Sequence, residues 1–180
     1  MNLTDSEKQF VRERANFACE YCGVSEHNAG GELTIDHFQP LSKDGDADDL
    51  ENLIYCCVRC NLYKSDFWVE SPNETHLFNP RTDELEKHFW FADDGYIFGL
   101  TEKGELSIRI LKLNRPQLIA YRSQQRSLQE ESRMVEESRT SLQILHRLIM
   151  EQREIINTQK RLLDEQNQML KILLEREKKS

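Results

Sequence analysis

Cys19-Glu20-Tyr21-Cys22 and Cys57-Val58-Arg59-Cys60 are the stretches that decide the fold, because each carries two cysteines at the spacing Cys-x-x-Cys. Each pair offers two sulfurs at the separation that a tetrahedral zinc ion requires, so two pairs complete one site. The loop-rich module between them spans residues 23–56. We therefore predict a structural Zn²⁺ ion held by four thiolates, those of Cys19, Cys22, Cys57 and Cys60.

Two other uses of these cysteines are weaker. A redox Cys-x-x-Cys expects a thioredoxin-like strand and helix around the pair, and neither pair has one. Four unligated core cysteines would not explain two matched spacings. The fifth cysteine, Cys56, breaks the spacing and is expected to pack as a small hydrophobic residue.

The bulk composition describes a chain of 180 residues that is 38% hydrophobic and 31% charged. No stretch approaches the roughly 18 apolar residues of a membrane span, and the first ten residues lack the apolar region of a secretory signal. A cytoplasmic protein without a membrane contact is expected. A module of about 60 residues has a marginal core, so bound zinc would contribute directly to its folding.

Short helices and strands are expected in the first half of the chain. Thr4 followed by Glu7 forms a capping box that starts a helix over Thr4–Asn16. Strand character marks Leu33–Phe38 and Leu53–Cys56, and a polar loop with a turn at Asp44-Gly45 lies between them. A second helix is expected from Arg59 to Phe67.

Strands are expected again from His88 onward. His88–Phe91 and Tyr96–Phe98 flank Asp93-Asp94-Gly95, which predicts a hairpin. Leu106–Ile110 alternates apolar and polar residues, which predicts a third strand. Asn114 is expected to cap a helix that has Pro116 in its first turn.

A second set of polar residues lies between the two cysteine pairs and directly after the second pair. It comprises Asp36-His37, then Asn52, then Cys60-Asn61-Leu62-Tyr63-Lys64. In this order, and over roughly Phe17 to Asp66, the chain resembles the HNH endonuclease family, in its four-cysteine zinc subgroup. Three later stretches also resemble segments found after the motif in many bacterial members: Leu77–Arg81, Gly99–Thr101 and Leu113–Pro116.

Hydrolysis of a phosphodiester requires an activated water and a Lewis acid. His37 suits the general base, because a neutral imidazole titrates near working pH. Asp36 and Asn61 offer the hard oxygen ligands that Mg²⁺ or Mn²⁺ prefers. The resemblance implies that Asn52 orients His37, and Lys64 and Arg59 are candidates for phosphate contacts. The third motif position is Asn61 instead of histidine, and an oxygen ligand in place of a nitrogen ligand favours Mg²⁺ and Mn²⁺ over softer ions.

The resemblance implies an α+β fold. A small zinc-braced ββα-metal domain is expected over residues 1–80, with a β-hairpin extension over 81–114. Residues 115–180 would form one long coiled-coil helix, because no glycine or proline follows Pro116.

The charge is unevenly spread. Residues 1–80 carry 6 Lys and Arg against 15 Asp and Glu, whereas residues 115–180 carry 13 against 10. Non-specific DNA affinity arises where Lys and Arg neutralise phosphates. The catalytic half alone is therefore expected to bind DNA poorly, and a partner protein or an oligomer would supply the missing DNA affinity.

The tail has a heptad repeat without a miss, formed by Leu128, Val135, Leu142, Ile149, Ile156, Leu163 and Leu170. This periodicity is typical of a coiled coil, and the helix would reach roughly 100 Å. Gln152, Gln159 and Gln166 occupy the alternate layers. Self-association is the first expectation, and a coiled coil with another protein is the second.

Two functions compete on these grounds. The first is a metal-dependent DNA endonuclease, for which a bacterial defence or mobile-element system is a compatible setting. The second is a non-catalytic zinc module that binds nucleic acid or scaffolds a complex. A zinc-dependent deaminase is disfavoured, because its H-x-E signature is missing at His37.

Overall fold

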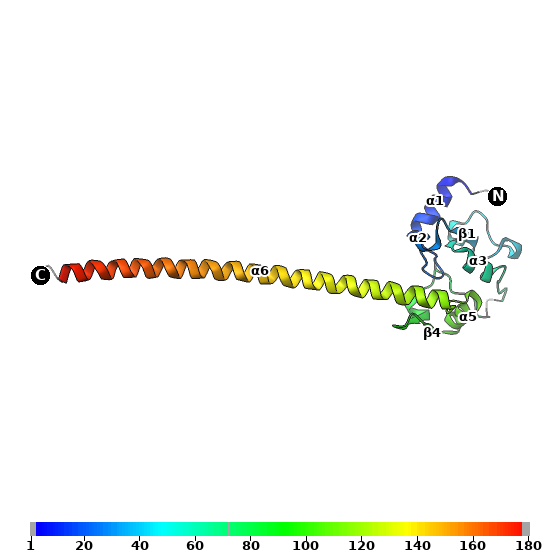
Figure 1. Cartoon of the computed structure of the whole chain (residues 1–180). Helices are drawn as coiled ribbons and strands as arrows, with labels where there is room; N and C mark the ends of the chain where they lie inside the picture. The colour runs from blue at the N-terminus through cyan, green and yellow to red at the C-terminus, as the bar shows by residue number, and fades with distance from the viewer. Residues whose placement is uncertain (1–2, 72, 178–180) are drawn as a thin grey trace. The chain divides into compact units, whose positions relative to one another are not determined.

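Two compact units make up the chain in the computed structural model, which describes residues 3–71 and 73–177. The first unit ends at Ser127 and the second begins at Leu128. The expected α+β class is confirmed by two small antiparallel sheets with short helices, followed by the long helix α6 (Figure 1). None of the helices in the described ranges is both long and apolar enough to cross a membrane. The division expected at residues 80 and 114 stays a prediction.

Helix α1 (Asp5–Arg14) begins with the predicted capping box. The Thr4 hydroxyl accepts from the Glu7 amide, and the Glu7 carboxylate accepts in return from the Thr4 amide at 2.8 Å. Val11 and Ala15 turn inward from this helix and its end. The short helix α2 (Glu26–Ala29) follows the first cysteine pair and is capped by Ser25.

Strands β1 (Thr34–His37) and β2 (Leu53–Cys56) pair antiparallel, with Asp36 opposite Ile54. The loop between them holds two 3₁₀ turns, η1 (Leu41–Lys43) and η2 (Leu50–Asn52). The predicted turn at Asp44-Gly45 is confirmed. It requires glycine, because a Cβ on Gly45 would lie 2.0 Å from the Gln39 carbonyl oxygen. Helix α3 (Val58–Lys64) follows β2 directly.

The two faces of the β1–β2 hairpin enter different cores, because side chains alternate along a strand. Leu53 and Tyr55 pack with Val11 and Ala15, on the α1 side. Ile54 and Cys56 pack into the larger cluster that includes the four paired cysteines. The hairpin is therefore covered on both faces, as the fully buried pattern of β2 requires.

The second sheet is the predicted hairpin, formed by β3 (Phe89–Phe91) and β4 (Ile97–Gly99) after the short helix α4 (Leu85–His88). The strand predicted over Leu106–Ile110 is wrong, because these residues lie in helix α5 (Glu102–Leu111).

The reason for α5 lies in its buried side. Thr101 caps the helix, and Gly104, Ser107 and Leu111 are its buried residues at helical spacing. A Cβ on Gly104 would lie 2.1 Å from the His88 carbonyl oxygen, so this close approach needs glycine. The apolar alternation of the neighbouring positions is too short to exclude a helix.

Helix α6 (Pro116–Glu177) runs without interruption in Figure 1, as the absence of later glycine and proline predicted. The capping role expected for Asn114 is wrong. Its side chain instead bonds both backbone groups of Ile97, accepting from the amide at 2.9 Å and donating to the carbonyl at 2.7 Å. Asn114 thus ties the start of α6 to strand β4.

Candidate functional site

The four paired cysteines converge as predicted. The sulfurs of Cys19, Cys22, Cys57 and Cys60 all lie within 4.8 Å of one another, and all four side chains are buried and free of disulfides. Cys22 Sγ and Cys57 Sγ are 3.8 Å apart. Zinc–sulfur bonds of about 2.3 Å in a tetrahedron place the sulfurs at about that separation. The residues present therefore fit a structural zinc ion.

Each cysteine pair is shaped by its own backbone. Gly23 takes a φ of +76°, which lets its amide donate to the Cys19 carbonyl at 2.7 Å and close the first turn. In the second pair, Cys57 caps helix α3 and its sulfur accepts from the Cys60 amide at 3.5 Å. Both turns aim two sulfurs at one point, as a zinc site requires.

Arg115 lies against this cluster from the start of α6. Its guanidinium nitrogens approach Cys57 Sγ and Cys60 Sγ at 3.9 Å, and it stacks over the Tyr63 ring at 5.6 Å. Four thiolates around a divalent ion carry two excess negative charges, so a fixed cation beside them offsets that charge. Sequence reasoning missed this contact, although Arg115 lies in the stretch Leu113–Pro116 that carries the family resemblance.

A buried ion pair holds the segment of the first cysteine pair through Glu20, which lies between Cys19 and Cys22. Glu20, whose side chain is 4% exposed, pairs with Arg81 and also accepts from the Tyr55 amide of β2 at 2.6 Å. Burial raises the pKa of Glu20 despite the two neighbouring arginines, Arg81 and Arg14. The pair links the loop after residue 77 to the segment that carries the first cysteine pair.

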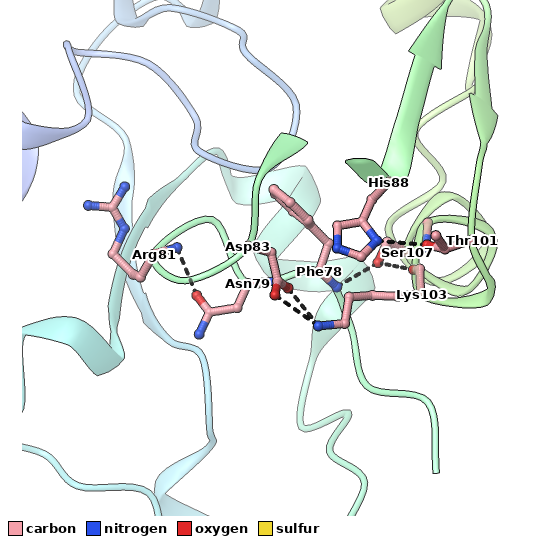
Figure 2. A network of polar contacts seen from close by, with 9 residues as sticks. Phe78, Asn79, Arg81, Asp83, His88, Thr101, Lys103 and Ser107 are labelled. Atoms are coloured by element: carbon pink, nitrogen blue, oxygen red, sulfur yellow. Dashed lines mark hydrogen bonds and ion pairs between the residues drawn. The ribbon is translucent and has the colours of Figure 1, made fainter. Parts of the chain in front are cut away.

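A polar network holds that loop against α5 (Figure 2). The Asp83 carboxylate accepts from Lys103 Nζ at 2.8 Å and from the Asn79 amide. Ser107 Oγ accepts from the Phe78 amide at 2.8 Å, and the Asn79 side chain accepts from the Arg81 amide at 2.9 Å. The stretch around residue 79 therefore lies against α5, and this contact holds the loop that carries Arg81.

Asp36 is held at the end of β1 by Lys64 from the last turn of α3. Lys64 Nζ lies 2.9 Å from Asp36 Oδ2 and donates to the His37 carbonyl oxygen at 2.8 Å. The two groups form an ion pair without hydrogen-bond geometry. The buried Oδ2 atom therefore has a counterion but no hydrogen-bond donor. The Lys64 side chain is fully buried, whereas the sequence suggested that it reaches a phosphate.

His37 follows Asp36 on β1 and faces the other side of the strand. It lines a cleft of about 480 Å³ between α1 and the β1–β2 hairpin, together with Lys8, Arg12 and Tyr55. Asp36 does not line this cleft, and neither do the cysteines. The predicted base thus borders open space large enough for part of a substrate, and the cleft lining holds two carboxylates, Asp5 and Glu32, as well as the two cations.

Asn52 is 9% exposed, and its amide is fully used in holding the loop between the strands. It accepts from the Gln39 amide at 2.8 Å and donates to the carbonyl oxygens of Gln39 and Asp46. These contacts reach the backbone two residues after His37 instead of the His37 ring.

Asn61 lies one turn before Lys64 on α3, so both side chains share the face that meets β1. It is partly exposed, and Arg59 is exposed on another part of the helix. The structure therefore brings Asp36 to the side of β1 that Lys64 of α3 contacts, whereas His37 lies on the side that faces α1.

Cys56 stands apart from the metal cluster, as predicted. It is fully buried on β2, and burial together with the neighbouring Asp36 charge raises its pKa to about 12. It stays a neutral thiol at ordinary pH and packs as a small hydrophobic residue.

Comparison with known proteins identifies the central part of this site. Residues 19–67 match the HNH endonuclease family, and this segment is an HNH endonuclease domain with a four-cysteine cluster. The chain is also distantly homologous to the Septu protein PtuA of Bacillus mycoides (strain KBAB4), at 26% identity over 145 residues. That alignment covers 65% of this chain and 20% of the relative, so the chain spans about a fifth of the relative's length. No solved structure matches.

Proposed function

Because residues 19–67 form an HNH endonuclease domain, we propose that the protein is a metal-dependent endonuclease that hydrolyses phosphodiester bonds in DNA. The observation that carries this proposal is the arrangement at the end of β1. There Asp36 is held by Lys64 from α3, and the next residue, His37, borders a cleft.

The proposed ligands of Mg²⁺ or Mn²⁺ are Asp36 and Asn61. Lys64 engages Asp36 Oδ2, and no hydrogen bond from any described residue engages the other oxygen, Oδ1. A carboxylate oxygen and an amide oxygen suit a hard divalent ion. When bound, this ion would supply Lewis-acid stabilisation of the scissile phosphate and the departing oxygen.

The chain's own residues supply the proton transfer and its geometry. His37, as the neutral imidazole, would accept a proton from the attacking water. Lys64 and Asn52 hold the backbone directly after that ring, through the His37 carbonyl and the Gln39 amide. Both are positioning residues in this proposal, because neither reaches the reacting atoms.

Substrate binding in this proposal depends on few cations. Lys64 is committed to Asp36, so Arg59 on α3 and the cleft residues Lys8 and Arg12 are left to meet phosphates. Both cleft residues already have carboxylate partners, because Arg12 pairs with Glu26 at 2.6 Å and Lys8 pairs with Asp5 at 3.4 Å. This arrangement supports the expectation that the first unit alone binds DNA weakly, which a gel shift of residues 1–127 at several salt concentrations tests.

The test of the proposed activity is plasmid cleavage with Mg²⁺ or Mn²⁺. We expect His37→Ala to lose at least 100-fold in rate, since general acid–base catalysis contributes about 10² to 10⁴. His27→Ala is the matched control, because His27 is exposed on α2. Equal inactivity of wild type and His37→Ala, with intact zinc content, would favour the non-catalytic zinc module instead.

We also propose that the nuclease is the effector of a bacterial defence or mobile-element system. Plating of phage on cells that carry the wild-type or the His37→Ala gene with its neighbouring genes tests this setting. Equal phage titres on both would contradict a defence role.

A further inference from the structure

We propose that helix α6 binds a second copy of this chain in a parallel, in-register coiled coil. The part of α6 that begins at Leu128 forms a unit by itself. Its large apolar side chains are exposed along its length, from Leu128 at 49% to Leu173 at 59%. Exposed apolar patches of this extent are typical of interaction surfaces.

The exposed stripe is three rows wide at 3.5 residues per turn. The central row repeats every seven residues as Leu145, Gln152, Gln159, Gln166 and Leu173. One apolar row on its side holds Leu148, Ile155, Leu162 and Met169, and the other holds Ile149, Ile156, Leu163 and Leu170. All of these side chains are exposed.

The three glutamines restrict what can cover the stripe. A purely apolar partner would bury their amides without hydrogen bonds, which is costly. A partner with amides at the same seven-residue spacing lets each glutamine donate to one amide and accept from it. A second copy of α6 has this spacing, which favours self-association over an unrelated apolar surface.

The central and flanking apolar rows do not decide the direction of the second helix. The order of polar and apolar positions in these rows is symmetric about Gln159. Parallel and antiparallel pairs would therefore both place glutamine opposite glutamine. Direction must come from the residues that border the stripe.

The borders carry opposite charges. Beside the Ile149 row lie His146, Arg153 and Lys160, and beside the Leu148 row lie Glu151 and Glu165 with Thr158 between them. In a parallel pair the basic border of one helix faces the acidic border of the other. In an antiparallel pair each border faces its own kind, which places Glu151 near Glu165 of the copy. Charge therefore selects the parallel pair.

A parallel pair has a consequence for cleavage, and this consequence rests on the proposed function. Each HNH domain precedes α6 in its chain, so both copies enter the coiled coil from the same end. One assembly would then carry two catalytic sites at the same end of the coiled coil, one for each strand of a duplex.

Single cysteines in the full-length zinc-loaded protein test the direction. In a parallel pair Gln152 meets Gln152 of the copy, so Gln152→Cys alone and Gln166→Cys alone should each form disulfide-linked dimers with oxidised glutathione. Asn157→Cys, on the opposite side of α6, is the matched control and should cross-link at least ten-fold more slowly. Cross-linking only in a mixture of the Gln152→Cys and Gln166→Cys proteins would show an antiparallel pair and overturn the proposal.

Mass and activity separate this proposal from the nuclease itself. Sedimentation equilibrium should give at least twice the chain mass of 21.3 kDa, and Ile156→Asp should reduce it to one chain. A wild-type mass of one chain would overturn the coiled coil whatever the activity. Inactive protein that still cross-links through Gln152→Cys would refute only the nuclease.

Discussion

Replacement of Lys64 by methionine should strongly destabilise the first unit. The Lys64 side chain is fully buried, and that of its partner Asp36 is 13% exposed, with 2.9 Å between the charged atoms. At an effective dielectric constant of about 20, two unit charges at this distance attract by about 6 kcal/mol. Desolvation offsets much of that, but Lys64→Met leaves the Asp36 carboxylate buried without its counterion.

The expected loss is about 3–5 kcal/mol, as for other buried pairs that lose one partner. This is a large share of the roughly 5–15 kcal/mol that stabilises an ordinary domain. Guanidinium unfolding followed by tryptophan fluorescence measures it, because Trp68 and Trp90 both lie in the first unit and α6 has no tryptophan. The midpoint should fall at an unchanged m value.

Lys87→Met is the matched control. Lys87 also pairs with a carboxylate, that of Glu84 at 2.7 Å, but both side chains are 67% exposed. Exposed pairs contribute about 0–1 kcal/mol. The double variant Lys64→Met with Asp36→Asn should recover part of the loss, because it removes the unpaired charge. If Lys64→Met costs no more than Lys87→Met, the pair is solvated and the predicted destabilisation is refuted.

Three further predictions concern the cysteine ligands, the arginine beside them and the Arg12–Glu26 pair. Cys57→Ser should lose zinc and unfold the first unit, whereas Cys56→Ala should keep one zinc per chain in metal analysis. Equal zinc loss in both would contradict the assignment of the four ligands. Arg115→Met should weaken zinc binding about 10- to 100-fold in a chelator competition, as loss of groups that contact metal ligands does. Arg109→Met, which alters an exposed arginine of α5, should leave it unchanged, and equal affinities would refute the role of Arg115. The hydrogen bond from Arg12 lowers the pKa of Glu26 below its ordinary value of 4.5. The ionised Glu26 carboxylate therefore contributes to the free energy of unfolding above pH 4.5. This contribution is lost as the pH falls through the lowered pKa that Glu26 has in the folded protein. Glu26→Gln should flatten that decline in acid unfolding, and an unchanged profile would speak against it.

Much of the site was predictable because its signals are local. The two Cys-x-x-Cys turns each place two sulfurs within a few residues of chain, and zinc chemistry then dictates that the pairs meet. The β3–β4 hairpin follows from Asp93-Asp94-Gly95, and α6 follows from an unbroken heptad repeat without glycine or proline. Each of these inferences needs only neighbouring residues.

Other features depended on contacts between distant segments. Residues Leu106–Ile110 have an alternation compatible with a strand, but Gly104 and Ser107 bring them into contact with residues 88 and 78 as a helix. Asn114 is a residue type that often caps helices. Strand β4 lies close enough that the backbone of Ile97 bonds both the oxygen and the nitrogen of its side-chain amide. Over five residues a local pattern is weaker than one buried packing contact.

The role of Lys64 shows the same division most clearly. The sequence by itself determined that a lysine stands one turn after Asn61 on a helix, next to a zinc knuckle. Only the tertiary structure decided that this lysine is buried against Asp36 instead of pointing at a phosphate. The reason is physical: a carboxylate at the end of β1 cannot be buried without a counterion. Which cation supplies it depends on how α3 packs on the hairpin, and no local pattern encodes that.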